Sequence, residues 1–167
     1  MFRMEVNEGR ETKTEKALKA LLKSNGEYVE IGHFSESGLH PEAEISYVDL
    51  MKYHSAGDPS KNIPSRPVLE ILRNSLLSVT KNIAINMALK SFRKSGFDLM
   101  ACEIALRKIG KIIGEEEVDI FGSNRLIGNA KRTQATKGEN APLVDTQALV
   151  KEVSYRDSIT RKIHKVL

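Results

Sequence analysis

The fold is decided by the stretch Tyr47-VDLMKYHSAGDPSKNIPSRPVLEILRNS-Leu76, which leads through a proline-rich connector into the longest apolar-periodic segment of the chain. It holds three of the five prolines. Pro64 and Pro67 each fix φ near about −65°, and they favour extended backbone at the residues before them. Arg66 is therefore predicted to lie on a stiff connector that leads directly into a helix.

Two helices are predicted after this connector. The first runs from about Arg66 to Lys94, because apolar residues recur along it at three- and four-residue steps. Gly96 ends it, and Asp98 caps a second helix. This helix either ends at Gly114 or, as we expect, extends over Glu115–Phe121. Since only a short connection separates them, the two helices are expected to pack antiparallel.

Alternating apolar and polar residues predict strands on either side of the helices. Tyr28–Phe34 and Ala43–Tyr47 are expected to pair as a hairpin, and Val48–Ser55 is expected to form a short helix. Val150–Arg156 is predicted as a third strand. Ser158–Leu167 is interpreted as a short strand or a basic tail.

These elements predict one α+β domain, in which two long antiparallel helices pack on a small antiparallel sheet with long flexible loops. A chain of 167 residues has an ordinary length for a single domain. Within residues 1–27 an amphipathic helix is expected from about Thr12 to Ser24. Residues 28–156 form the predicted core and residues 157–167 a basic C-terminal tail.

The regular pattern fails from Gly122 to Ala141, which predicts a long loop that is functional or becomes ordered on contact. Residues 120–138 contain no acidic side chain, so the cations in this window are candidates for partner contacts. A single helical turn is expected at Pro142–Leu149, with Asp145 or Thr146 as its cap. The candidate cations are Arg125, Lys131, Arg132 and Lys137.

The residue inventory argues against an enzyme. Cys102 is the only cysteine and lies in an apolar helical pattern, so it can form neither an internal disulfide nor a cysteine-based metal site. The four histidines lack the spacing of metal ligands, although His33 and His40 across a turn form a conceivable pair. The run 115–117 of three glutamates is interpreted as a solvated helical face. With no phosphate-binding glycine loop either, no catalytic, metal or cofactor residue is assigned.

Charge and hydropathy leave an interaction protein as the favoured class. The formal net charge of +4 permits a nucleic-acid partner without requiring one. Only 5% of the residues are aromatic, which disfavours a base-stacking surface. No segment approaches the roughly 18 apolar residues of a membrane span, and the first residues lack a signal-peptide core. A soluble protein made in the cytosol is expected.

Two segments resemble signatures of a known family. Ile63-PSRPV-Leu69 resembles the iPaRPFL signature of small virion-morphogenesis proteins of tailed bacteriophages, which are neck or tail-completion proteins that help to join tail to head. Thr133…Lys137-GENAPLVDTQA-Leu149 is similar to the second signature of the same family, and the family also places two helices between the signatures. The resemblance covers about residues 28–156. Gln147 stands where the family usually has glycine, so the turn there is not expected to use a positive φ.

The resemblance implies a structural virion protein without catalytic activity or cofactor, which acts in head–tail joining or tail completion and is assembled in the host cytoplasm. Its implied partners are further copies in a neck ring and other neck or tail proteins, such as a tail terminator, a head-closure protein or a tail-tube protein, and no membrane. The candidate contact residues are Pro64, Arg66, Pro67, Arg125, Lys131, Arg132 and Lys137, with Asp145 and Thr146 as structural caps.

Three alternatives stay open at this point. Arg66 can instead form an intramolecular ion pair. The acid-free loop can contact DNA phosphates without reading the sequence. The whole chain can also be a small basic nucleic-acid-binding protein.

Overall fold

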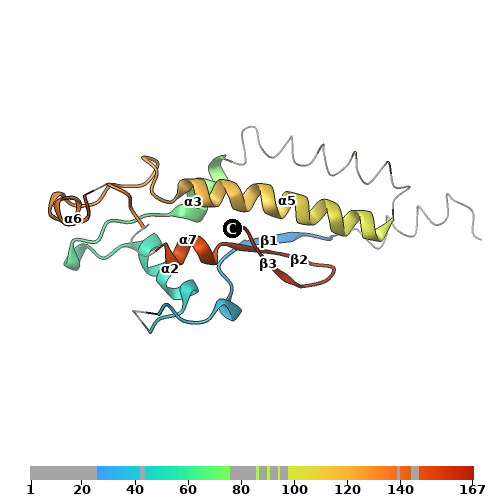
Figure 1. Cartoon of the computed structure of the whole chain (residues 1–167), viewed down its shortest axis with the longest axis horizontal. Helices are drawn as coiled ribbons and strands as arrows, with labels where there is room; N and C mark the ends of the chain where they lie inside the picture. The colour runs from blue at the N-terminus through green and yellow to red at the C-terminus, as the bar shows by residue number, and fades with distance from the viewer. Residues whose placement is uncertain are drawn as a thin grey trace, which may run out of the picture.

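The computed structural model describes residues 26–41, 44–75, 86, 90, 94, 98–138, 140–143 and 147–167, without the side chains of Leu99, Arg132 and Lys137. It has an α+β architecture with a three-stranded antiparallel sheet (Figure 1). The elements follow in the order β1 (Val29–Gly32), η1 (Ser35–Ser37), α2 (Tyr47–Ala56), η2 (Pro59–Lys61), α3 (Val68–Ser75), α5 (Leu99–Ile120), α6 (Lys131–Lys137), α7 (Ala148–Glu152), β2 (Ser154–Asp157) and β3 (Ile163–Lys165).

The sheet joins the two ends of the described chain. Its order is β1-β2-β3, with Ile31 opposite Tyr155 and Tyr155 opposite His164. The predicted hairpin of Tyr28–Phe34 with Ala43–Tyr47 is therefore wrong. Ser46 is the reason, because its hydroxyl accepts a hydrogen bond from the Asp49 amide at 3.1 Å and so begins α2 at the position where the strand was expected to continue.

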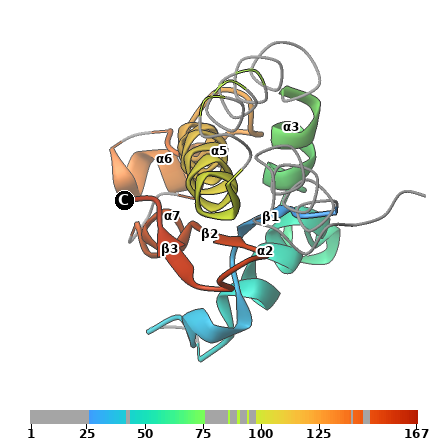
Figure 2. The same cartoon turned by 90° about the vertical axis from the view of Figure 1, so that its right-hand side faces the viewer.

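Helix α5 packs on one face of the sheet and is seen nearly end-on in Figure 2. Two glycines on its inner face allow the close approach. A Cβ added to Gly110 would lie 2.5 Å from the Tyr155 ring and 2.9 Å from Val29, and one added to Gly114 would overlap Val166. The helix axis therefore sits nearer to the sheet than larger side chains would permit.

The helix predictions are confirmed in part. The second helix has Asp98 at its N-cap position and continues to Ile120, as predicted, although the Asp98 side chain makes no capping hydrogen bond. The first helix begins at Val68, two residues later than predicted, because the carbonyl of Pro67 accepts the first helical bond from Ile71. Residues 86, 90 and 94 are also helical. Most of residues 76–97 and the whole Thr12–Ser24 segment lie outside the described residues, so the pair of long helices and the N-terminal helix stay predictions.

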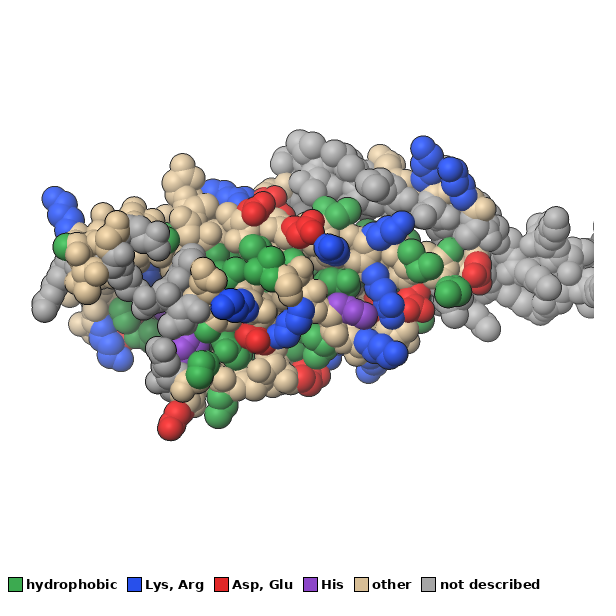
Figure 3. Space-filling view, in the orientation of Figure 1, with side chains coloured by type: hydrophobic (Ala, Val, Ile, Leu, Met, Phe, Trp, Pro, Cys, Tyr) green, Lys and Arg blue, Asp and Glu red, His purple; other side chains and the backbone are tan. Residues whose placement is uncertain are grey.

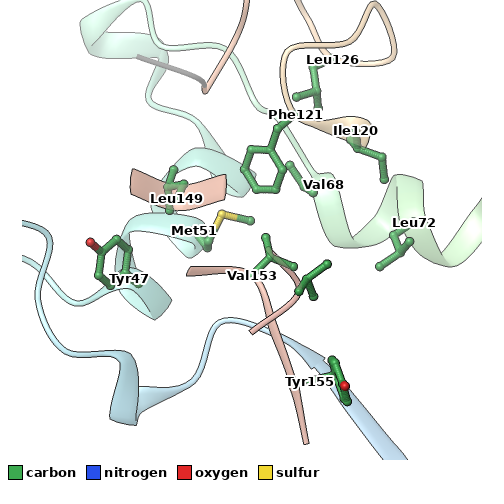
Figure 4. Close-up of a cluster of buried hydrophobic side chains, with 11 residues drawn as sticks. Tyr47, Met51, Val68, Leu72, Ile120, Phe121, Leu126, Leu149, Val153 and Tyr155 are labelled. Atoms are coloured by element: carbon green, nitrogen blue, oxygen red, sulfur yellow. The ribbon is translucent and has the colours of Figure 1, made fainter. Parts of the chain in front are cut away.

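The apolar core lies where α2, α3 and α7 meet the C-terminal end of α5 and the sheet (Figure 4). Glu117 belongs to this interior and is fully buried, so the expected solvated face of residues 115–117 is wrong for its third member. The reason is helical spacing, since Glu117 follows Gly114 by three residues on the face that packs against the sheet. The buried apolar residues of this cluster are Tyr47, Met51, Val68, Leu72, Ile120, Phe121, Leu126, Leu149, Val153, Tyr155 and Val166.

The segment from Gly122 to Ala141 is not entirely a loop, because α6 occupies seven of its residues. Helix formers such as Ala135 and Gln134 favour this turn of helix, and Gly138 ends it in the left-handed conformation at φ 76°. All residues of α6 except Ala135 are polar, so this helix has no apolar periodicity that the sequence could reveal.

The C-terminal predictions are also corrected. Residues 150–152 belong to α7, and the strand predicted over Val150–Arg156 starts only at Ser154. Residues 163–165 form β3, so the strand alternative for the end of the chain is confirmed over these three residues.

Gln147 precedes α7 with a left-handed backbone at φ 56°, so the expectation that this turn avoids a positive φ is wrong. Gln147→Gly is expected to raise the free energy of unfolding by up to about 1 kcal/mol, because glycine adopts this conformation without a Cβ clash. Denaturant unfolding measures the change. The control Lys151→Gly, at an exposed helical position, should lower stability by about 1 kcal/mol. A loss of stability in Gln147→Gly would contradict the prediction.

Candidate functional site: the Arg66 junction

The connector, residues 57–67, is held in one conformation by its own backbone. Gly57 ends α2 at φ 72°, and a Cβ there would lie 2.6 Å from the Ser65 amide nitrogen and 2.8 Å from the Ile63 carbonyl oxygen. Asp58 caps the short η2 helix by accepting a hydrogen bond from the Ser60 amide at 3.1 Å. The connector thus folds back against the end of α2.

Two hydrogen bonds fix the far end of the connector to the last turn of α2. The Ser65 hydroxyl donates to the Ser55 carbonyl at 2.5 Å, and the Arg66 amide donates to the His54 carbonyl at 2.7 Å. These bonds set the direction in which the Arg66 side chain leaves the backbone. The stiffness inferred from the prolines is therefore reinforced by contacts that the sequence does not reveal.

The Arg66 guanidinium points into the protein and binds the loop that follows α5. Arg66 as a whole is only 7% exposed. Nε donates to the Ile127 carbonyl at 2.9 Å, and Nη2 donates to the Gly128 carbonyl at 3.3 Å and to Asn129 Oδ1 at 3.1 Å. All three acceptors are neutral, so Arg66 forms no ion pair with the described residues.

The charge of Arg66 affects the neighbouring imidazole. Burial lowers the pKa of His54, and the positive charge of Arg66 lowers it further. His54 is therefore expected to be neutral at pH 7. Burial also lowers the pKa of the Arg66 guanidinium, but an arginine remains charged throughout the physiological range.

The same junction brings in the second signature segment. The Asn129 amide donates to Asn140 Oδ1 at 2.7 Å, and a Cβ at Gly128 would lie 2.8 Å from the Asn140 side chain. The Gly122 amide donates to the Pro142 carbonyl at 2.9 Å. The two signature segments, separated by about 70 residues along the chain, thus meet around Arg66 and Asn129. We define the Arg66 junction as the connector together with residues 122–130 and 140–142.

Asn129 is the central residue that sequence reasoning missed. It accepts from Arg66 through its side chain, donates to Asn140 through its amide, and accepts from the Gln134 side chain at 2.5 Å through its carbonyl. Its only sequence signal is its place after Gly128 in the window without acidic residues. That signal does not identify a partner.

An open groove of about 510 Å³ runs between the connector and residues 128–130. Pro64, one of the predicted contact residues, lines it together with Ile63, Pro59 and Ala130. The connector and α6 lie at the same end of the molecule, away from the β2–β3 turn (Figure 1). This end presents a rigid, mainly apolar groove to the surroundings.

The predicted basic contact residues are not equivalent. Arg125 forms an ion pair with Glu116 in α5, with Nη1 2.6 Å from Oε1, so its charge is already compensated. Lys131 is exposed and has no ion pair within the described part of the chain. The side chains of Arg132 and Lys137, and all of Asp145 and Thr146, lie outside the described residues, so their roles stay predictions.

A larger group of cations lies elsewhere. Figure 3 shows many Lys and Arg side chains on the face where α5 and the β2–β3 hairpin run. Several of these cations have acidic partners, such as Lys111 with Glu115. The exposed lysines and arginines of these elements are Lys108, Lys111, Arg161, Lys162 and Lys165.

Comparisons of the chain with protein-family models, curated proteins and solved structures gave no match. Among the described residues, no helix is both long enough and apolar enough to cross a membrane. The same residues contain no group of three or more His, Cys, Asp or Glu side chains placed to hold a metal ion.

Proposed function

We propose that this protein is a non-enzymatic structural subunit of a tailed-phage virion, acting in head–tail joining or tail completion. One observation carries the proposal. The two segments that resemble the family signatures, Ile63–Leu69 and Thr133–Leu149, come together at one end of the molecule through Arg66, Asn129 and Asn140. Two signature segments that lie together in space are better explained by one common contact surface than by two unrelated loops.

The proposed contact surface is the groove end of the Arg66 junction. A ring subunit needs a surface whose shape is fixed before it meets a neighbour, because this reduces the entropy lost on assembly. The connector supplies such a surface through its prolines and the fork of Arg66. Ile127 adds an exposed apolar side chain, at 59% exposure, next to the carbonyl that Arg66 binds. In this proposal the neighbours are further copies of the chain and other neck or tail proteins.

Electron microscopy of particles made without this protein tests the proposed role. Filled heads beside complete but unattached tails are the expected result. Intact particles in normal numbers would overturn the proposal. The same particles complemented with the wild-type protein serve as the control and should regain attached tails.

A surface variant tests the proposed contact. Ile127→Asp is expected to leave the fold intact, because the side chain is exposed, and to reduce the yield of joined particles at least about tenfold through burial of a charge in the contact. Leu39→Asp is the matched control, since Leu39 is similarly exposed at 62% and lies between η1 and α2. Circular dichroism checks folding. Equal yields from the two variants would place the contact elsewhere.

A small basic nucleic-acid-binding protein is the second candidate, favoured by the cations over α5 and the β2–β3 hairpin. Binding through phosphates would give an affinity for duplex DNA that falls steeply with salt and shows no sequence preference. Lys108→Glu with Lys162→Glu should then weaken binding, while Lys131→Glu should not. No binding at low salt would exclude this candidate.

A further inference from the structure

Glu117 is a buried carboxyl group that the proposed function does not use. It lies in the last turns of α5 with 0% of the residue exposed, and neither side-chain oxygen accepts a hydrogen bond from the described residues. A buried carboxylate without hydrogen bonds is costly, whereas a protonated carboxyl is not. The groups around Glu117 therefore decide whether its carboxyl group keeps a proton.

Asp157, the other fully buried carboxylate among the described residues, shows the contrast. It accepts hydrogen bonds from the Thr160 amide at 2.7 Å and the Thr160 hydroxyl at 2.8 Å, and Arg107 lies 3.4 Å away. Burial alone would raise the pKa of Asp157, but these groups outweigh it and lower the pKa. Asp157 is thus held as an anion, and Glu117 has no comparable support.

His33 faces Glu117 from the end of β1, and its side chain is 1% exposed. Its Nε2 lies 2.8 Å from the Leu149 carbonyl of α7. Because a carbonyl only accepts, Nε2 carries a proton and donates it, which leaves Nδ1 of the neutral ring as an acceptor. Nδ1 lies 3.8 Å from Glu117 Oε1. Two acceptors would therefore face each other unless a proton lies between them.

We propose that His33 and Glu117 share one proton as a net-neutral buried pair, and that this proton holds β1 and α7 against the end of α5. The 3.8 Å separation exceeds a hydrogen bond by about 1 Å, so a small side-chain rotation completes the contact. Loss of the proton leaves a buried carboxylate opposite a lone pair. The inference is independent of the proposed function.

The charged groups around the pair are bound to one another, so the titration of the pair depends mainly on His33 and Glu117 themselves. The His33 ring stacks near Tyr47 of α2 at 6.4 Å and meets Phe121 edge-on at 6.3 Å. The charges that reach His33 are Glu152 of α7 and Lys165 of β3, which pair with each other and act in opposite directions. The neighbouring Glu116 is paired with Arg125. The cavity that His33 lines is also lined by the apolar Val68 of α3 and by Lys52 of α2, which is paired with Asp49.

The sign of the pH dependence follows from both groups. Burial raises the pKa of Glu117 from 4.5 to about 7, so the folded protein keeps a proton that the unfolded chain has released. Stability is therefore lost as pH rises through this window, at most tenfold in the folding equilibrium constant per pH unit, or about 300-fold in all. Burial lowers the pKa of His33, so its contribution is lost as pH falls below the ordinary value of 6.5. The two contributions therefore oppose each other below pH 6.5, and from there to about pH 7 only the loss caused by Glu117 remains.

Nuclear magnetic resonance on the wild-type protein tests the sharing directly. The ¹³C signal of the Glu117 carboxyl should titrate near pH 7, and the ¹⁵N signal of His33 Nδ1 should change with the same midpoint. A Glu117 midpoint near its ordinary 4.5 would overturn the proposal. So would a His33 transition unrelated to that of Glu117.

A variant pair provides the second test. Glu117→Gln keeps the shape, cannot ionise and can donate an amide proton to Nδ1, so it should remove the loss of stability that Glu117 causes between about pH 4.5 and pH 7. Glu115→Gln, at the 55% exposed side chain two residues earlier, is the control and should titrate like the wild type. If Glu117→Gln retains the wild-type pH profile, the pair does not set it. If that variant fails to fold, the resonance measurement on the wild type still decides.

Discussion

Gly110→Ala is expected to destabilise the protein by about 1–3 kcal/mol, although alanine normally stabilises a helix interior by about 1 kcal/mol relative to glycine. The reason is the packing of α5 on the sheet. The added methyl group would lie 2.5 Å and 2.8 Å from two carbons of the Tyr155 ring and 2.9 Å from Val29. Both neighbours belong to paired strands, so they cannot move apart without disturbing the pairing of β1 with β2.

The sign of the change makes this variant informative. Urea unfolding of Gly110→Ala should show a lower free energy of unfolding with an unchanged slope, and the larger Gly110→Val should prevent folding. Lys108→Ala, two residues earlier on the exposed side of α5, is the matched control and should change stability by less than about 0.5 kcal/mol. An increase in stability for Gly110→Ala would mean that α5 lies farther from the sheet than described.

Local patterns predicted the start of α5, and its end with Gly114 as an alternative, but not the pairing of the sheet. The apolar repeat of α5 from Leu99 to Ile113 covers about four turns and therefore stands above chance variation. The alternation in β1 was also visible, but its partner β2 lies about 120 residues later, and nothing local identifies it. The five residues Ala43–Tyr47 alternate equally well, yet the capping hydroxyl of Ser46 starts a helix there. Short alternating runs do not distinguish these outcomes.

The sequence predicted the stiff backbone of the connector but not the contacts that its side chains make. Prolines fix dihedral angles wherever they occur, so the stiffness of the connector followed from the sequence. The partners of Arg66 are mostly backbone carbonyls, which every residue has, so no sequence pattern reveals them. Glu117 was hidden for a similar reason, because a run of three glutamates looks solvated until the position of Gly114 on the packed face is known.

Arg66→Met is expected to lower the free energy of unfolding by about 3 kcal/mol, because methionine fills similar space but leaves three partly buried acceptors without their charged donor. Arg66→Lys should recover less than half of the loss, since an ammonium group cannot reproduce the fork that reaches Ile127, Gly128 and Asn129. Arg73→Met is the matched control on the exposed side of α3, and it should change stability by less than about 0.5 kcal/mol.

Hydrogen exchange locates the effect and links it to assembly. In Arg66→Met the amides of Gly122 and Asn129 should lose protection first, because their bonds to Pro142 and Asn140 depend on a loop that Arg66 fixes. Failure of Arg66→Met to support joined particles therefore does not by itself identify a contact residue. The comparison with Ile127→Asp separates the two roles, since that variant keeps the loop protected while it changes the exposed surface. If Arg66→Met is as stable as Arg73→Met, the buried fork does not hold the junction together.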